Sequence, residues 1–108
     1  WWDKPAQPCL ASRIPFGEEI SSKRLEQIAL AEEWIVNQGF SKVRVRSQGL
    51  SARIELPANE INHFLKIIER KKLIEYFLYL GFHSISLDLE GLISGKLTRH
   101  INTTNNSV

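Results

Sequence analysis

The feature that most restricts the fold is a short pattern that occurs twice. Gly39-Phe40 is followed by Ser41-Lys42-Val43-Arg44-Val45, and Gly81-Phe82 is followed by His83-Ser84-Ile85-Ser86-Leu87. Each copy comes after an amphipathic segment of helical periodicity, and glycine commonly ends a helix in a left-handed conformation. The chain thus repeats a unit of helix, Gly-Phe and strand. Economical packing of such units predicts an α+β fold: a small mixed or antiparallel sheet of about three or more strands, with two to three helices on one face.

The first predicted helix carries a carboxylate among its apolar residues. Ser21 or Ser22 can cap this helix, which runs to about Gln38. Its apolar stripe consists of Leu25, Ile28, Ala29, Ile35 and Val36. At about 100° per residue, Glu32 falls inside this stripe. Because an unpaired buried charge is costly, Glu32 is expected either to pair with an arginine or to line an anion and metal pocket. Trp34 lies on the opposite side, where an exposed tryptophan indicates a contact with another domain or subunit.

A predicted hairpin follows, in which apolar and basic residues alternate. Its apolar members are Val43, Val45, Ala52, Ile54 and Leu56. With a turn at Gln48-Gly49, or in a neighbouring register that keeps these residues on one face, the other face gathers Arg44, Arg46, Arg53 and Glu55. Opposed like charges destabilise a sheet, so this face is expected to hold an anion such as phosphate. The alternative is a solvated face on which Glu55 and Lys42 balance the charges.

The second half of the chain supplies two more apolar stripes and a third strand. The first stripe contains Ile61, Phe64, Leu65 and Ile68, and the second contains Leu73, Ile74, Phe77, Leu78 and Leu80. In the strand, Ile85, Leu87 and Leu89 are expected to point to the core, which leaves Ser84, Ser86 and Asp88 on the other face. His63 and His83 are isolated, and no cysteine and histidine set has the spacing of a zinc site.

Composition narrows the class of protein. A chain of 108 residues that is 43% hydrophobic supports one modest core. A net charge of +2 does not indicate a nucleic-acid or membrane partner, and no membrane-length apolar run or signal peptide is recognised. One cysteine cannot form an internal disulfide, so a cytoplasmic protein is expected. Residues 101–108 are polar and without periodicity, which predicts a disordered tail.

The cysteine stands in a setting that can activate a thiol. Cys9 lies between Lys4 and Arg13, with Ser12 close by in the sequence. Nearby cations favour the thiolate, which is the nucleophilic form. The alternative is a small buried apolar residue, because free cysteine is among the most buried residue types. The residues alone leave both interpretations open.

Five segments together resemble a known family. They are Trp2 to Ala6, the run Cys9-Leu10-Ala11-Ser12-Arg13-Ile14-Pro15-Phe16-Gly17, Gly39-Phe40, Val43-Arg44-Val45-Arg46 and Leu87-Asp88-Leu89-Glu90-Gly91. They are similar to the C-terminal domain of LarE-type ATP-dependent sacrificial sulfur transferases, which help to build a nickel-pincer nucleotide. The resemblance runs from Trp2 to about Gly95 and makes residues 1–100 that domain. The family places an ATP-pyrophosphatase (PP-loop) domain before this segment, and its Ser-Gly-Gly-x-Asp-Ser loop does not occur here. Leu92 and Ile93 replace an aromatic residue and an arginine of the family.

The resemblance implies a role for each candidate residue. Cys9 would donate sulfur, Ser12 and Arg13 would position it and contact substrate phosphate, and Arg44 with Arg46 would hold that phosphate. Arg53 is added to this phosphate site because the predicted hairpin places it on the same face as Arg44 and Arg46. Glu32 and Glu55 would be pocket carboxylates that meet a divalent metal. ATP and Mg²⁺ would bind mainly to the PP-loop domain, and the expected partners are that domain, a nucleotide-type substrate and further copies of the chain. The alternative function is a non-catalytic nucleotide-binding, phosphate-binding or oligomerisation module.

Overall fold

The structure is a computed structural model, which describes residues 13–15 and 17–92. Helix α1 spans Ser22–Val36, strand β1 spans Arg44–Gln48 and strand β2 spans Ser51–Glu55. Helices α2 (Ala58–Ile67) and α3 (Arg70–Leu80) follow, and strand β3 (Ser84–Leu87) comes last. The predicted α+β class is confirmed, with three helices and a three-stranded sheet in the described part of the chain. The predicted tail at 101–108 lies outside the described residues.

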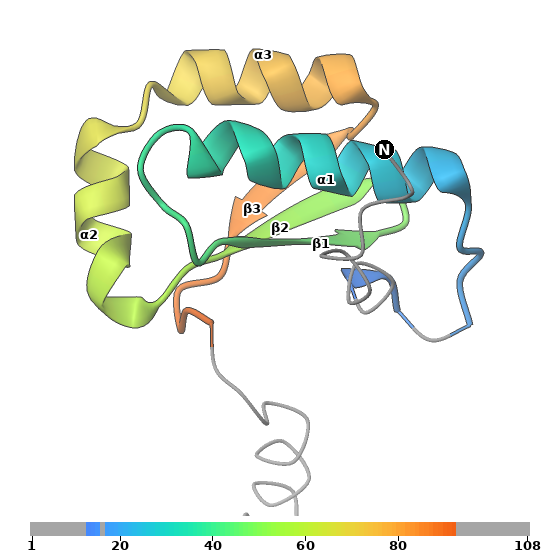
Figure 1. The fold of residues 1–108 in the computed structure, drawn as a ribbon, viewed down its shortest axis with the longest axis horizontal. Coiled ribbons are helices and arrows are strands. Elements are labelled where there is room, and N and C mark those ends of the chain that lie inside the picture. The colour runs from blue at the N-terminus through green and yellow to red at the C-terminus, as the bar shows by residue number, and fades with distance from the viewer. Residues whose placement is uncertain (1–12, 16, 93–108) are drawn as a thin grey trace, which may run out of the picture.

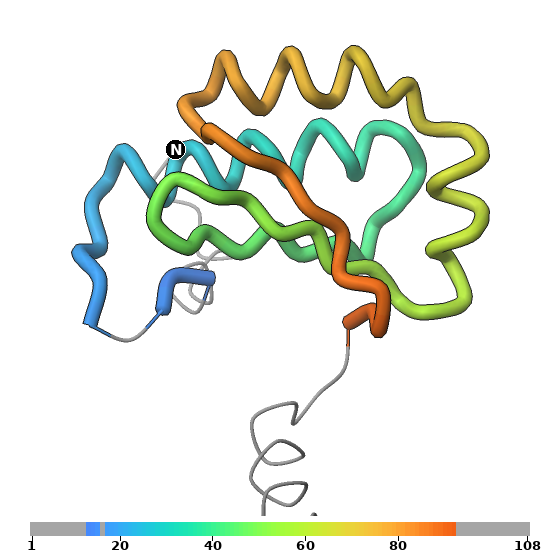
Figure 2. Tube along the Cα trace, turned by 180° about the vertical axis from the view of Figure 1, so that it is seen from behind, coloured from blue at the N-terminus to red at the C-terminus, as the bar shows by residue number. Residues whose placement is uncertain are grey.

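The sheet is mixed, as expected, and β2 is its central strand. Strands β1 and β2 are antiparallel, and β2 and β3 are parallel. Figure 2 shows how the chain leaves β2 through α2 and α3 before it returns beside β2 as β3. Of the registers predicted for the hairpin, a neighbouring one is observed rather than the one with a turn at Gln48-Gly49, because Gln48 pairs with Ser51 and the turn is Gly49-Leu50. Glycine is needed at the first position of this two-residue turn, where φ is +58°.

Both copies of the Gly-Phe pattern end a helix in the same way. Gly39 and Gly81 have φ values of +109° and +114°. The Gly39 amide donates to the Val36 carbonyl and Phe40 donates to Ile35, while Gly81 donates to Leu78 and Phe82 donates to Phe77. This pair of bonds is the Schellman arrangement, which satisfies carbonyls at a helix end. The predicted start is confirmed too, since the Ser21 hydroxyl accepts from the Arg24 amide.

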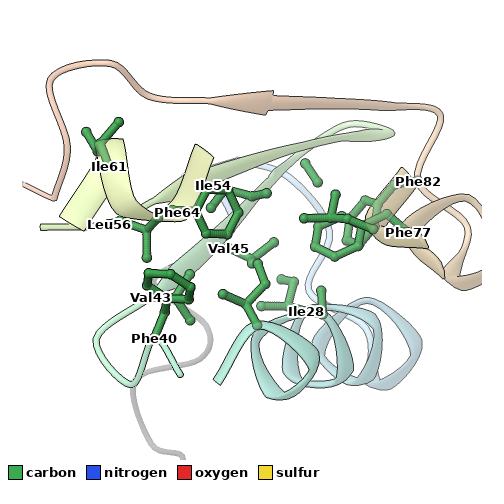
Figure 3. Close-up of a cluster of buried hydrophobic side chains, with 14 of the residues drawn as sticks. Ile28, Phe40, Val43, Val45, Ile54, Leu56, Ile61, Phe64, Phe77 and Phe82 are labelled. Atoms are coloured by element: carbon green, nitrogen blue, oxygen red, sulfur yellow. The ribbon is translucent and has the colours of Figure 1, made fainter. Parts of the chain in front are cut away.

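Helices α1 and α3 cover one face of the sheet, and α2 lies at one end of it (Figure 1). The core between helices and sheet consists of aromatic and branched aliphatic side chains, most of which belong to the apolar stripes predicted from the sequence (Figure 3). Its fully buried members include Ile28, Ile35, Phe40, Val43, Val45, Leu56 and Phe77. Because the apolar alternation of both hairpin strands faces this core, their charged residues occupy the opposite face.

Two apolar predictions need correction. Leu89 is 80% exposed rather than in the core, because β3 ends at Leu87 and the chain turns there. Trp34 is half-buried instead of exposed, since its ring stacks on Tyr76 of α3 at a centroid distance of 6.2 Å. Burial raises the pKa of the Tyr76 phenol, and the nearby Glu33 charge raises it further. Trp34 thus joins α1 to α3 within this chain.

The helical stripes are only partly covered. Phe64, Leu73 and Phe77 are buried, whereas Leu65 and Leu78 are at least half exposed and Ile74 is partly exposed. An apolar groove of about 460 Å³ lies between α2, α3 and β3. Its lining includes Phe64, Leu65, Ile68, Leu73, Ile74, Ile85 and Leu87. None of the helices in the described residues is long and apolar enough to cross a membrane.

The loop after β3 depends on a close approach of two backbone segments. Gly91 has a φ of +87°, and a Cβ there would lie 2.7 Å from the Leu56 carbonyl oxygen. The Leu92 amide donates to that same carbonyl at 2.7 Å. Only glycine fits both the conformation and the space, which explains its place in the Leu87 to Gly91 motif.

Candidate functional site

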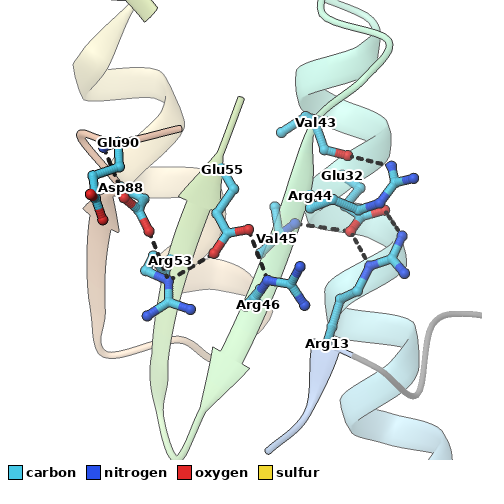
Figure 4. Close-up of polar contacts among 10 residues, drawn as sticks. All are labelled: Arg13, Glu32, Val43, Arg44, Val45, Arg46, Arg53, Glu55, Asp88 and Glu90. Atoms are coloured by element: carbon cyan, nitrogen blue, oxygen red, sulfur yellow. Dashed lines mark hydrogen bonds and ion pairs between the residues drawn. The ribbon is translucent and has the colours of Figure 1, made fainter. Parts of the chain in front are cut away.

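The hairpin brings the predicted arginines to one face. Arg44 pairs with Glu55 and Arg46 pairs directly with Arg53 across β1 and β2. The alternation along both strands directs these four residues away from the core, and Figure 4 shows Arg46, Arg53 and Glu55 together on one side of the sheet. The predicted gathering of Arg44, Arg46 and Arg53 beside Glu55 is therefore confirmed, in one of the neighbouring registers that the apolar pattern allowed.

Glu55 compensates the charge of this face. Its side chain is 2% exposed, and each of its oxygens accepts a hydrogen bond from a different arginine. Arg46 Nε donates to Oε1 at 2.9 Å, and Arg53 Nε donates to Oε2 at 3.1 Å. Two guanidinium groups thus take the place of water at this buried carboxylate. The interpretation of Glu55 as a balancing charge is supported by these contacts.

Asp88 also reaches this face. Its Oδ2 atom lies 3.8 Å from Arg53 Nε, and its Oδ1 atom accepts the Glu90 amide at 3.0 Å. Asp88 was predicted on the outward face of the third strand but was not counted as a site residue. The signal that identifies it is the alternation of Ser84, Ser86 and Asp88, once β3 is known to pair with β2.

A second ion pair joins the N-terminal segment to α1 and β1. Arg13 Nε donates to Glu32 Oε2 at 2.9 Å, and Arg13 Nη2 donates to Oε1 at 3.4 Å. The Val45 amide donates to Glu32 Oε2 at 2.9 Å. The two side chains are 8% and 13% exposed, so the prediction that Glu32 is largely buried is confirmed. Of its two predicted environments, the ion pair with an arginine is the one observed.

Three of the predicted phosphate-binding arginines share a small hollow, here called the arginine concavity. It has a volume of about 340 Å³ and is lined by Arg13, Pro15, Arg46, Ser47, Gln48 and Arg53. The concavity therefore combines guanidinium groups from two strands and from the N-terminal segment. Arg44 is not part of its lining, and its Nη1 donates to the neighbouring Val43 carbonyl at 3.0 Å.

The rim of the concavity is fixed by a network that starts at the beginning of α1. Arg24 Nη2 donates to the Ser47 hydroxyl and to Glu18 Oε1, each at 2.9 Å. The Gly49 amide donates to Glu18 Oε1 at 3.0 Å. The Gly49 hydrogen bond, followed by that from Arg24, lowers the pKa of the Glu18 carboxyl. These contacts tie the hairpin turn to the segment that carries Arg13.

The remaining predicted site residues are of two kinds. Cys9 and Ser12 lie outside the described residues. Glu32 and Glu55 were predicted to meet a divalent metal, yet their oxygens accept hydrogen bonds from arginines. Across residues 13–15 and 17–92, no group of three or more His, Cys, Asp and Glu residues is arranged to hold a metal ion. This arrangement suits an anion better than a cation, because the concavity is lined by three cations.

The chain matches no known protein family profile, but it is similar to several longer proteins. It is 48% identical over 99 residues to an uncharacterized protein of Synechocystis, which covers 92% of this chain and 37% of that protein. It is 36% identical over 96 residues to pyridinium-3,5-bisthiocarboxylic acid mononucleotide synthase of Lactiplantibacillus plantarum, or 89% of this chain and 34% of the synthase. An uncharacterized protein of Methanocaldococcus jannaschii is 33% identical over 87 residues, which are 80% of this chain and 33% of that protein.

These similarities support the relation to LarE-type synthases that the sequence motifs indicated. The match covers most of this chain. However, the chain spans only about a third of the length of each relative.

Proposed function

We propose that this chain is the substrate-binding and sulfur-donating part of an ATP-dependent sulfur transferase. The substrate would be a pyridinium carboxylate mononucleotide, and the product would serve nickel-pincer cofactor synthesis. The observation that carries the proposal is the arginine concavity, in which Arg13, Arg46 and Arg53 surround a space of about 340 Å³. The similarity to a synthase of a pyridinium bisthiocarboxylic acid mononucleotide supports the class of substrate.

The concavity suits a phosphate group for a simple physical reason. Guanidinium groups donate paired, planar hydrogen bonds to phosphate oxygens, and they stay charged at any physiological pH. Arg13, Arg46 and Arg53 come from three segments, so together they can contact different oxygens of one anion. Arg44 adds to the positive potential from the same face without lining the concavity.

In the proposed reaction, a preceding PP-loop domain transfers AMP from ATP to a substrate carboxylate and releases pyrophosphate, with Mg²⁺ held by that domain. The Cys9 thiolate attacks the acyl carbon and AMP leaves, which forms a thioester. A base then removes the Cys9 α-proton and the Cβ–S bond breaks. Sulfur stays on the substrate as a thiocarboxylate, and Cys9 becomes dehydroalanine. Each chain therefore acts once.

Phosphate binding is tested directly on this chain. Titration with inorganic phosphate, followed by NMR, is expected to shift the guanidinium signals of Arg13, Arg46 and Arg53. Arg46→Ala should weaken binding at least about tenfold, because a charge-assisted hydrogen bond is lost. Lys23→Ala removes an exposed charge from α1 and serves as the matched control. Equal losses in both variants would contradict a site at the concavity.

Sulfur donation is tested in a longer protein that carries the PP-loop domain. With ATP, Mg²⁺ and the mononucleotide, its intact mass should fall by about 34 Da, the mass of H₂S lost through the covalent route. Product should stop at one sulfur per chain, and Cys9→Ser should abolish it. Product that accumulates over many turnovers with Cys9 intact would contradict sacrificial donation. Phosphate binding in the absence of any sulfur transfer would favour the alternative, a non-catalytic phosphate-binding module.

A further inference from the structure

Glu55 stands out because a buried carboxylate faces the same side as three arginines. Arg44, Arg46 and Arg53 share its side of the sheet, and its side chain is 2% exposed. We infer that Glu55 is a positioning residue of the anion site, whose carboxylate orients the guanidinium groups of Arg46 and Arg53 toward one shared anion. This inference rests on the proposed phosphate site.

Glu55 contacts both arginines through the same atom of their guanidinium groups. Glu55 accepts the Nε hydrogen of Arg46 at 2.9 Å and that of Arg53 at 3.1 Å. The Nε bond fixes the direction of a guanidinium plane, while the two terminal nitrogens extend beyond it. Figure 4 shows both groups held by Nε with their terminal nitrogens directed away from Glu55. Glu55 thus sets where the other donors of each arginine point.

The register of the hairpin places two of these arginines opposite each other. Arg46 and Arg53 are direct partners across the two strands, where like charges repel. Two long side chains without a common acceptor would move apart, and Arg53 is 45% exposed, so it has room to do so. The bridging carboxylate holds them together before any ligand arrives. The entropy cost of ordering these two side chains is then met when the chain folds, so it does not reduce the affinity for the anion.

The same two arginines make Glu55 a poor ligand for a divalent metal ion. A cation bound to this carboxylate would lie beside two guanidinium groups that already contact its oxygens. Coulomb repulsion opposes that arrangement. The observed contacts of the Glu55 carboxylate are therefore those of a residue that orients arginines and not those of a metal ligand.

Removal of the Glu55 charge distinguishes positioning from a simple effect of net charge. Glu55→Gln makes the face more positive, so a simple charge argument predicts tighter anion binding. If Glu55 positions the arginines, the same change leaves a single acceptor oxygen for Arg46 and Arg53, so at least one of them is released and binding weakens. The two effects have opposite signs, which makes the sign of the change decisive.

The experiment uses the 108-residue chain and inorganic phosphate as the probe. Phosphate affinity and the Nε–H signals of Arg46 and Arg53 are measured by NMR in wild type and in Glu55→Gln. The matched control is Glu26→Gln, which removes the same charge from an exposed position of α1. We expect Glu55→Gln to weaken phosphate binding about tenfold, since at least one ordered side chain is released. At least one of the two Nε–H signals should also move and exchange faster with water, whereas Glu26→Gln should change neither.

A second variant covers the case in which Glu55→Gln does not fold. Arg53→Lys keeps the charge at a half-exposed position but removes the Nε donor. It should weaken phosphate binding and leave the Arg46 Nε–H signal in place. Unchanged or tighter binding in Glu55→Gln or Arg53→Lys, with wild-type binding present, would overturn the inference alone. A wild-type chain that binds no phosphate would overturn the proposed anion site and the inference together.

Discussion

The two helix, Gly-Phe and strand units share a core and differ at their outer edges. When Phe40 is aligned with Phe82, Ala31 falls on Leu73 and Ile35 falls on Phe77, and all six side chains are buried. The outward positions do not match. Arg44 and Arg46 of β1 correspond to Ser86 and Asp88 near β3. The apolar positions and the helix end thus make a common scaffold, and the outward positions give each copy its own surface.

The greatest difference lies where each helix meets its edge strand. In the first unit Glu32 accepts the Val45 amide and holds Arg13 against the strand. The equivalent residues of the second unit, Ile74 and Leu87, line the apolar groove beside β3. One edge is therefore covered by the N-terminal segment through an ion pair, while the other is an open apolar hollow. Similar scaffolds with different edge residues thus produce two different surfaces. Beside β1 lies a polar seam, formed by Arg13, Glu32 and the Val45 amide, and beside β3 lies the apolar groove.

The largest expected effect tests whether the two units share one core. Phe40→Ala and Phe82→Ala should each lower the free energy of unfolding by about 3–5 kcal/mol, because each leaves a cavity in a packed layer. Urea unfolding followed by circular dichroism measures the change. Leu50→Ala, at the exposed hairpin turn, is the control and should stay within about 0.5 kcal/mol. A loss at only one phenylalanine would mean that the two units are not equivalent.

The second prediction concerns the different edges. Glu32→Ala should cost about 3 kcal/mol, because it leaves the buried Arg13 charge without its carboxylate. Ile74→Ala, at the equivalent position, should cost less than about 1 kcal/mol, since Ile74 is already partly exposed. The same unfolding measurement applies. Similar losses in the two variants would show that the polar seam adds nothing to the first edge.

The third prediction compares the helix ends. Gly39→Ala and Gly81→Ala should each cost about 1–2 kcal/mol, because alanine resists positive φ. Gly81→Ala should cost about 1 kcal/mol more, since its Cβ would displace the Gln27 amide, which donates to the Leu80 carbonyl at 2.6 Å. Near Gly39 no atom lies within 4 Å of an added Cβ. A larger loss at Gly39 would contradict this order.

The smallest expected effect is a pH dependence at Glu18, which contacts the hairpin turn of the first unit. The pKa of Glu18 in the folded chain lies below its ordinary value of 4.5. Its contribution to stability is therefore present above that ordinary value and is lost as the pH falls through the lower folded value. Glu18→Gln should unfold more easily than wild type at neutral pH, and the difference should vanish in acid. A difference that persists at low pH would assign it to packing instead of charge.

Several features of the site were predictable because they depend on local pattern. Alternation along β1 and β2 was enough to place Arg44, Arg46 and Arg53 on one face, since an even spacing keeps side chains on the same side of a strand. The burial of Glu32 followed from helical periodicity in the same way. Leu89 was misplaced because alternation carries no information on where a strand ends. Trp34 was misplaced because its partner, Tyr76, comes from a helix far away in the sequence.

By itself, the sequence determined the scaffold of this protein. The repeated Gly-Phe pattern, the Ser21 cap and the apolar alternation act through neighbouring residues, so they specify helix ends, strand faces and the α+β class. Only the tertiary structure decided how the charges pair. Glu55 meets both Arg46 and Arg53 because the hairpin turns at Gly49-Leu50, and Glu32 meets Arg13 because the N-terminal segment returns to α1 and β1. Such pairings depend on register and on contacts between distant segments, which no local pattern encodes.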